Sequence, residues 1–152
     1  MDVDDGAGPA MFRLVRFWSR QWAPDVVQRL DAEAPETWTV QNLYVIQAIH
    51  SASGSSDEVT VADVARQLGL DRSVASRMIT EAAGDGYVLR ETSERDARRA
   101  ALSLTEEAQR YLASAIAFQH QAFDRLVEHW PAEDCERFSG YLRRLAGEVL
   151  TG

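Results

Sequence analysis

Apolar side chains recur every three or four residues near both ends of the chain, which predicts amphipathic helices there. The first helix is expected to start at residue 11, with apolar side chains at Met11, Leu14, Val15, Trp18 and Trp22. Thr105 is a suitable N-cap for the longest helix, expected from about Glu106 to His129. Such a helix spans roughly 35 Å, so we expect it to extend beyond the core of its own domain.

The two C-terminal helices carry matching apolar stripes. The stripe of the longest helix consists of Ala108, Tyr111, Ala115, Phe118 and Ala122. Pro131 is expected to open the last helix, because proline is favoured in a first helical turn. Its stripe consists of Phe138, either Tyr141 or Leu142, Leu145 and Val149.

The middle of the chain is built from shorter segments. A helix capped by Thr39 is expected to face inward with Val40, Leu43, Ile49 and either Ile46 or Tyr44. The serine-rich segment 51–57 (SASGSSD) predicts a loop.

Two short helices separated by a tight turn come next. Thr60 and Asp63 form a T-x-x-D capping box for the helix VADVARQL, which is expected to end at Gly69. Asp71 is expected to cap the following helix, which Gly84 and Gly86 end. Its inward side chains are expected to be Val74, Met78 and Ile79. This arrangement is typical of a helix-turn-helix.

The segments YVLRET and RAALSLT flank the polar run SERDAR, which predicts a β-hairpin with a charged tip. The order helix, turn, helix, hairpin predicts a winged helix-turn-helix. The expected fold is therefore mainly α with a small β wing and flanking dimerisation helices. Its parts are a disordered tail at 1–10, an N-terminal dimerisation helix and linker at 11–36, the winged helix-turn-helix at 37–105 and C-terminal dimerisation helices at 106–152.

The charge distribution narrows the choice of partner. The 152 residues hold 16 arginines, no lysine and 24 acidic residues, a net charge of −8. This balance argues against a protein that coats nucleic acid with its whole surface. Residues 60–105, however, hold seven arginines and seven acidic residues, so this part repels an anionic partner least.

The second helix of the helix-turn-helix is suited to the major groove of DNA. A face opposite its apolar residues is expected to present Arg72, Ser73, Ser76, Arg77 and Thr80. Arginine can bind guanine or phosphate, and small hydroxyls allow close approach. At the hairpin tip Arg95, Arg98 and Arg99 cluster and favour the same partner. The alternative is an ordinary solvated surface.

Five motifs follow one another along the chain: TVQNLYVIQAI, VADVARQLGL, DRSVASRMI, Gly86-Tyr87-Val88, and Asp96-x-Arg98 followed by LSLT. In this order they resemble the multiple-antibiotic-resistance regulator (MarR) family, and the resemblance covers residues 12–150. The resemblance implies a homodimer that presents two recognition helices to one pseudo-palindromic DNA operator. It places Ser73, Ser76 and Arg77 in the major groove and Arg98 in the minor groove, with Asp96 helping to hold the wing. One departure is Ala82, where the family usually has leucine; it predicts a recognition helix that ends early or packs loosely.

The predicted function is a cytoplasmic transcription regulator, a repressor that is not an enzyme and needs no cofactor. The alternative is a winged-helix dimer that binds protein and no specific DNA. Relatives are commonly released from DNA by small aromatic or anionic compounds. The residues predicted to bind such an effector are Arg13, Arg16, Trp18 and Trp22, with Arg20 nearby; the alternative is that these tryptophans pack in the dimer interface.

Other classes of protein are excluded or disfavoured. No run approaches the roughly 20 apolar residues of a membrane span, and the acidic N-terminus does not resemble a secretory signal. His120 and His129 are nine residues apart and His50 is remote, so no metal site is expected. The single Cys135 is interpreted as a structural or idle thiol.

Overall fold

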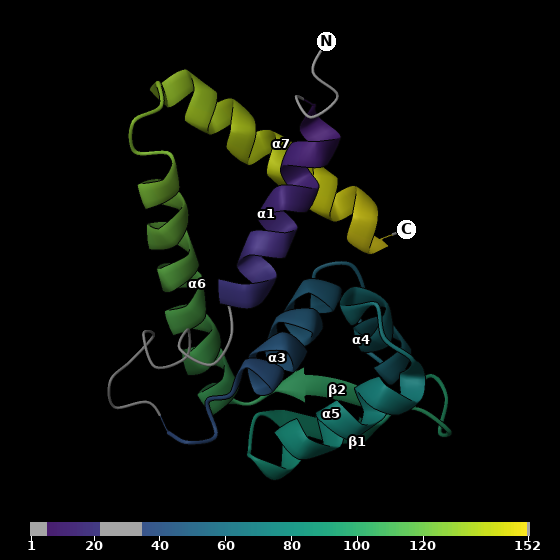
Figure 1. Ribbon diagram of the computed structural model, residues 1–152. Helices are drawn as coiled ribbons and strands as arrows, with labels where there is room; N and C mark the ends of the chain where they lie inside the picture. The colour runs from purple at the N-terminus through teal and green to yellow at the C-terminus, as the bar shows by residue number, and fades with distance from the viewer. Residues whose placement is uncertain (1–5, 22–34, 152) are drawn as a thin grey trace. The chain divides into compact units, whose positions relative to one another are not determined.

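The computed structural model describes residues 6–21 and 35–151 (Figure 1). The chain forms two compact units, residues 1–40 and 41–152. The elements are α1 (Ala7–Gln21), α3 (Val40–Ser53), α4 (Val61–Leu68), α5 (Arg72–Gly84), β1 (Val88–Thr92), β2 (Ala100–Leu104), α6 (Glu106–Leu126) and α7 (Ala132–Thr151). This confirms the predicted fold class of helices with a small β wing.

Helix α1 begins at Ala7, before the predicted start at residue 11. The predicted disordered tail is therefore wrong for residues 7–10. Pro9 lies in the first turn, where its missing N–H would have no helical acceptor in any case. Residues 1–5 and most of the predicted linker, with Trp22, lie outside the described residues.

Helix α3 runs three residues further than predicted, to Ser53. The reason is that its buried face continues by one turn, from Ile49 to Ala52. The Ser53 hydroxyl donates a hydrogen bond to the His50 carbonyl (2.7 Å). Ile46 is fully buried while Tyr44 is 44% exposed, so Ile46 is the inward residue of the two alternatives.

Helix α4 has the predicted capping box. The Asp63 carboxylate accepts from the Thr60 N–H (2.9 Å), and the Thr60 hydroxyl accepts from the Asp63 N–H (3.4 Å). Gly69 ends the helix with a φ of +63°, a left-handed conformation that glycine adopts without strain. The turn that separates α4 from α5 is therefore as tight as predicted.

Helix α5 begins after Asp71, but the Asp71 side chain makes no capping hydrogen bond, so its predicted capping role is wrong. An acidic residue at this position still favours the helix through its charge alone. The buried residues are Ala75, Ile79 and Ala82, while Val74 and Met78 are half-buried.

The expectation attached to Ala82 is also wrong. The helix continues past it to Gly84, and Ala82 is completely buried. The Ala82 carbonyl accepts from the N–H of Tyr87 (2.9 Å), and Tyr87 is buried as well. The chain thus turns tightly at Gly86 (φ +87°) and enters the hairpin close to the end of α5.

The hairpin is the predicted wing. Val88 pairs with Leu104 and Thr92 with Ala100 in an antiparallel register. On the outer side of β2, the Leu102 N–H donates to the Val59 carbonyl (2.8 Å). This bridge ties the wing to the segment before α4. Figure 1 shows α3, α4 and α5 grouped around the hairpin.

Helix α6 starts at the predicted cap, with the Thr105 hydroxyl accepting from the Ala108 N–H (3.2 Å). It ends at Leu126, three residues earlier than expected. Its fully buried residues all lie in its first half, so the second half extends beyond the core as predicted: Ala108, Tyr111, Leu112 and Ala115. Burial raises the pKa of the Tyr111 hydroxyl, and the adjacent Tyr87 adds to this effect.

Helix α7 packs back on α6 near the turn between them. Phe138 stacks on Phe123 with ring centroids 6.0 Å apart and contacts Trp130 at 5.3 Å. Beyond this contact the apolar stripe of α7 is exposed. Both Tyr141 and Leu142 are exposed, so the choice between them stays open.

Candidate nucleic-acid interface

The five predicted residues of α5 lie on its outer surface. Four of them are exposed and Ser76 is half-buried: Arg72, Ser73, Arg77 and Thr80. The fully buried residues of this helix occupy the other positions. The polar face is therefore exposed as predicted, but of the predicted inward residues Val74, Met78 and Ile79 only Ile79 is buried, because the helix is turned so that the small Ala75 and Ala82 face the core.

Thr80 is the exception in this group, because its hydroxyl already has two partners. It donates to the Ser76 carbonyl (2.9 Å) and accepts from Arg90 Nη1 (2.9 Å). Arg90 lies on β1, so this hydrogen bond joins the wing to the polar face of α5. Arg90 is not among the residues predicted from the sequence to contact DNA. A strand position alone gives no sign of the contact, which depends on how the hairpin packs against α5.

The tip of the wing is held by a buried serine. The Ser93 hydroxyl accepts the N–H groups of Arg95 and Asp96 (3.1 Å each) and donates to Glu58 Oε2 (2.8 Å). Beside it, Arg95 forms an ion pair with Asp57 (2.9 Å). The segment before α4 therefore anchors the wing tip, and Arg95 is drawn to this side of the wing.

Asp96 organises the rest of the tip. Its Oδ1 accepts from the Arg98 N–H (3.0 Å), and its Oδ2 lies 3.3 Å from Arg99 Nε. This geometry is what the resemblance implies for a residue that holds the wing. Asp96 therefore orders the segment that carries Arg98 and Arg99.

Four arginines from three elements line one cavity of about 280 Å³, which we call the arginine basket. Its cationic residues are Arg72 of α5, Arg90 of β1, and Arg98 and Arg99 of the wing. The remaining lining is Ala100 and the start of α4, residues 60–62. No acidic side chain lines the basket. The structure thus brings together three of the arginines selected from the sequence, adds Arg90, and leaves Arg77 and Arg95 apart.

The charge of this surface is largely uncompensated. Over residues 6–21 and 35–151, the side chains of Arg72, Arg77 and Arg98 make no ion pair or hydrogen bond with the protein. Five other exposed arginines pair with a carboxylate three or four residues away, as Arg110 does with Glu107. In a protein of net charge −8, free guanidinium groups on one surface point to an anionic partner.

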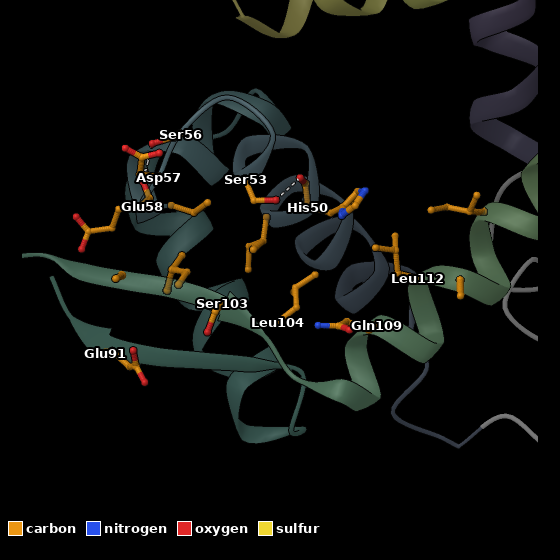
Figure 2. A pocket seen from close by; sticks show the side chains of 16 residues that line it. His50, Ser53, Ser56, Asp57, Glu58, Glu91, Ser103, Leu104, Gln109 and Leu112 are labelled. Atoms are coloured by element: carbon orange, nitrogen blue, oxygen red, sulfur yellow. Dashed lines mark hydrogen bonds between the residues drawn. The ribbon is translucent and has the colours of Figure 1, made fainter. Parts of the chain in front are cut away.

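A larger cavity of about 770 Å³ lies between α3, β2 and α6 (Figure 2). Figure 2 shows Asp57 and Glu58 at one end and Leu112 at the other. Glu91 also lines it. Three carboxylates disfavour an anionic ligand, so this cavity does not suit an anionic effector.

The predicted effector residues lie on α1, apart from Trp22, which is outside the described residues. Arg13 and Arg16 are exposed and Trp18 is half-buried. The side chain of Arg20 is not among those described. The effector site stays a prediction.

The remaining candidates for chemistry in the sequence are the histidines and Cys135. Within the part of the chain that the structure describes, no group of three or more His, Cys, Asp or Glu side chains could hold a metal ion. The Cys135 thiol donates to the carbonyls of Val127 (3.6 Å) and Trp130 (3.8 Å), so it helps to hold the turn between α6 and α7. None of the described helices is long and apolar enough to cross a membrane.

Comparison with known proteins points to one family. The sequence model of the MarR family matches residues 39–99, which include α3, α4, α5 and most of the wing. No curated protein sequence matches the chain. Proteins of the MarR family are DNA-binding transcription regulators and not enzymes.

Solved structures share the fold over nearly the whole chain. A MepR variant from Staphylococcus aureus has a TM-score of 0.72 at 14% identity, covering 95% of this chain and 99% of MepR. The PcaV regulator of Streptomyces coelicolor, solved with its natural ligand, has 0.62 at 20% identity, covering 96% and 95%. A second MepR variant, bound to an oligodeoxyribonucleotide, has 0.57 at 16% identity, covering 95% and 99%. The resemblance seen in the sequence is thus confirmed: residues 39–99 match the model of the MarR family, and the solved structures share the fold.

Proposed function

We propose that this protein is a transcription regulator that binds a DNA operator through α5 and the wing. The observation that carries the proposal is that α5 and the wing expose Arg72, Arg77 and Arg98 without an ion pair to any described residue, in a protein of net charge −8. The exposure of Ser73 and Arg77 on α5 supports contact with base edges in the major groove. Arg98 lies on the wing, which reaches the adjacent backbone and minor groove.

The protein acts as a homodimer. Helix α1 exposes Met11, Phe12, Leu14, Val15 and Phe17, and α7 exposes Tyr141, Leu142, Leu145 and Val149. Monomeric proteins rarely expose apolar patches of this extent. Pairing these helices between two copies would bury them and present two α5 helices to one pseudo-palindromic operator.

Repression with release by an effector completes the proposal. Such a protein resides in the cytoplasm with its DNA, and an operator that overlaps a promoter blocks transcription while it is occupied. An aromatic or anionic effector near Arg13, Arg16 and Trp18 acts if it binds the DNA-incompetent spacing of the two winged domains better. A tenfold preference at each of two sites shifts the balance by about 2.8 kcal/mol.

The deciding experiment is a gel-shift titration with the DNA upstream of the protein's own gene. A random duplex of the same length and composition serves as the control, at several salt concentrations. Tighter binding to the upstream DNA, with affinity falling steeply with salt, is expected. Equal and weak binding to both duplexes by an intact dimer would overturn the proposal. It would favour the alternative, a winged-helix dimer that binds protein and no specific DNA.

A further inference from the structure

We propose that the arginine basket is the seat of one backbone phosphate of the operator, between the groove read by α5 and the groove reached by the wing. This inference rests on the proposed function and specifies how its DNA is held. Arg90, the basket residue not predicted from the sequence to contact DNA, is assigned as a phosphate contact.

The charge and size of the basket suit a phosphodiester. Four guanidinium groups border a space of about 280 Å³ with no carboxylate in its lining. A liquid water takes about 30 Å³, so the basket has room for a phosphate group and several waters. Guanidinium forks match the oxygens of a phosphate with two parallel hydrogen bonds, which makes arginine the preferred partner.

The start of α4 adds backbone donors to the same cavity. Residues 60–62 line it, and the capping box already uses the N–H groups of Thr60 and Asp63. The N–H groups of Val61 and Ala62 belong to the first turn, where a helix offers no acceptor of its own. An anion in the basket would therefore lie beside residues whose backbone N–H groups have no helical acceptor, at a helix end where the Asp63 carboxylate already accepts the Thr60 N–H.

Arg90 is prepared for this contact before DNA arrives. Its Nη1 donates to Thr80, which fixes one edge of the guanidinium, and a guanidinium has five N–H donors. Holding the side chain in advance lowers the entropy lost on binding. Thr80 is therefore a positioning residue for Arg90, and its hydroxyl does not read a base.

The place of the basket favours DNA over a small free anion. Arg72 belongs both to the basket and to the polar face of α5, and Arg98 belongs both to the basket and to the wing tip. A duplex that contacts both elements must carry its backbone past the basket. The Arg98 side chain has no ion pair or hydrogen bond within the part of the protein that the structure describes. Of the basket arginines on the wing it is therefore the one that can move into the minor groove.

The test places one neutral methylphosphonate linkage at each position of the operator in turn. With wild-type protein, we expect one position in each half-site to lose about tenfold in affinity. Arg90→Ala should bind the unmodified operator about tenfold more weakly, with a salt slope lower by about one, and should no longer respond to that linkage. Arg110→Ala, on α6, is the matched control and should behave as wild type.

Two further variants separate contact from positioning. Arg90→Lys keeps the charge, so it should retain the salt slope while losing part of the affinity. Thr80→Val removes only the hydroxyl, so it should bind more weakly than wild type and still respond to the same linkage. Thermal unfolding of each variant checks that its fold is intact.

The outcomes are distinguishable. A wild-type protein that shows no preference for the operator overturns the proposed function. Specific binding with an unchanged linkage response in Arg90→Ala overturns the phosphate seat alone. Inorganic phosphate that displaces DNA from wild type more than chloride at equal ionic strength, without any single sensitive linkage, would assign the basket to a free anion and overturn the seat.

Discussion

At the scale of single residues, neighbouring arginines on this surface differ in what they can do. Arg77 is exposed on the polar face of α5 without an ion pair to another described residue, whereas Arg95 is held by Asp57 at 2.9 Å. Exposed ion pairs of this kind contribute about 0–1 kcal/mol, so Arg95 could exchange Asp57 for another anion at small cost. Among these arginines, removal of the unpaired ones should therefore weaken DNA binding most.

Arg98→Ala and Arg77→Ala should weaken DNA binding in different ways. Arg98→Ala should reduce affinity for operator and random DNA alike and lower the salt slope, because it removes a cation near the backbone. Arg77→Ala should cost about 1–3 kcal/mol on the operator and relax preference at one base pair, because arginine discriminates bases through two hydrogen bonds. Dissociation constants for a set of operator variants at several salt concentrations measure both effects. Unchanged operator affinity in a folded Arg98→Ala protein would contradict the assignment of the wing.

Ser93 is the residue on which the wing tip depends. Ser93→Ala removes an acceptor for two N–H groups and a donor to Glu58, in a buried site. Leaving such groups unpaired should cost about 1–3 kcal/mol in the free energy of unfolding. Urea unfolding measures the loss, with Ser103→Ala, at an exposed position of β2, as the control. Equal stability of the two variants would show that the tip does not rely on this hydroxyl.

At the scale of elements, the sequence predicted best those features that neighbouring residues decide. The capping box of α4, the turn at Gly69 and the cap at Thr105 follow from local hydrogen bonds and backbone preferences, and the structure confirms them. The first helix begins earlier than predicted because residues 7–10 show no apolar periodicity, although a first turn needs none and tolerates Pro9. Helix α3 is longer because Ala52 packs into a core formed by distant segments.

The arginine basket could be predicted from the sequence only in part. Arg72 was predicted from the helical periodicity, and Arg98 and Arg99 were predicted because arginines cluster at the hairpin tip. Periodicity and clustering are both visible in residues that are close together in the sequence. The contact from Arg90 to Thr80 joins a strand to a helix, and the ion pair of Arg95 with Asp57 joins residues 38 positions apart. Such contacts depend on tertiary packing, which a single sequence does not display.

Acid should weaken the capping box of α4. Partial burial alone would raise the pKa of Asp63, but hydrogen bonds from Thr60 and Arg66 outweigh it and hold the pKa below its usual 3.8. A lowered folded-state pKa means that the charged carboxylate stabilises the fold at neutral pH, and that this contribution is lost as the pH falls through the folded-state value. Asp63→Ala should therefore cost about 1 kcal/mol at pH 7 and less at pH 3, measured by urea unfolding at each pH. An equal cost at both pH values would contradict this role.

At the scale of the whole molecule, the negative net charge opposes the proposed binding to DNA. A charge of −8 repels DNA, so binding depends on presenting the arginine surface while the acidic regions face away. A dimer strengthens this arrangement, because binding of one half-site raises the effective concentration of the second α5 to about the millimolar range. DNA binding should then depend on residues far from the arginines.

Leu145→Glu tests this dependence. Leu145 lies in the exposed apolar stripe of α7, and a charge there should prevent two copies from burying the stripe. Wild-type protein should sediment as a dimer at micromolar concentration and the variant as a monomer, with operator affinity reduced at least tenfold because the half-sites are bound separately. Arg144→Gln, which removes only an exposed ion pair with Glu148, is the matched control and should stay dimeric. A dimeric Leu145→Glu protein would move the interface away from this stripe, whereas a monomeric variant that keeps full operator affinity would show that one winged domain binds the operator alone.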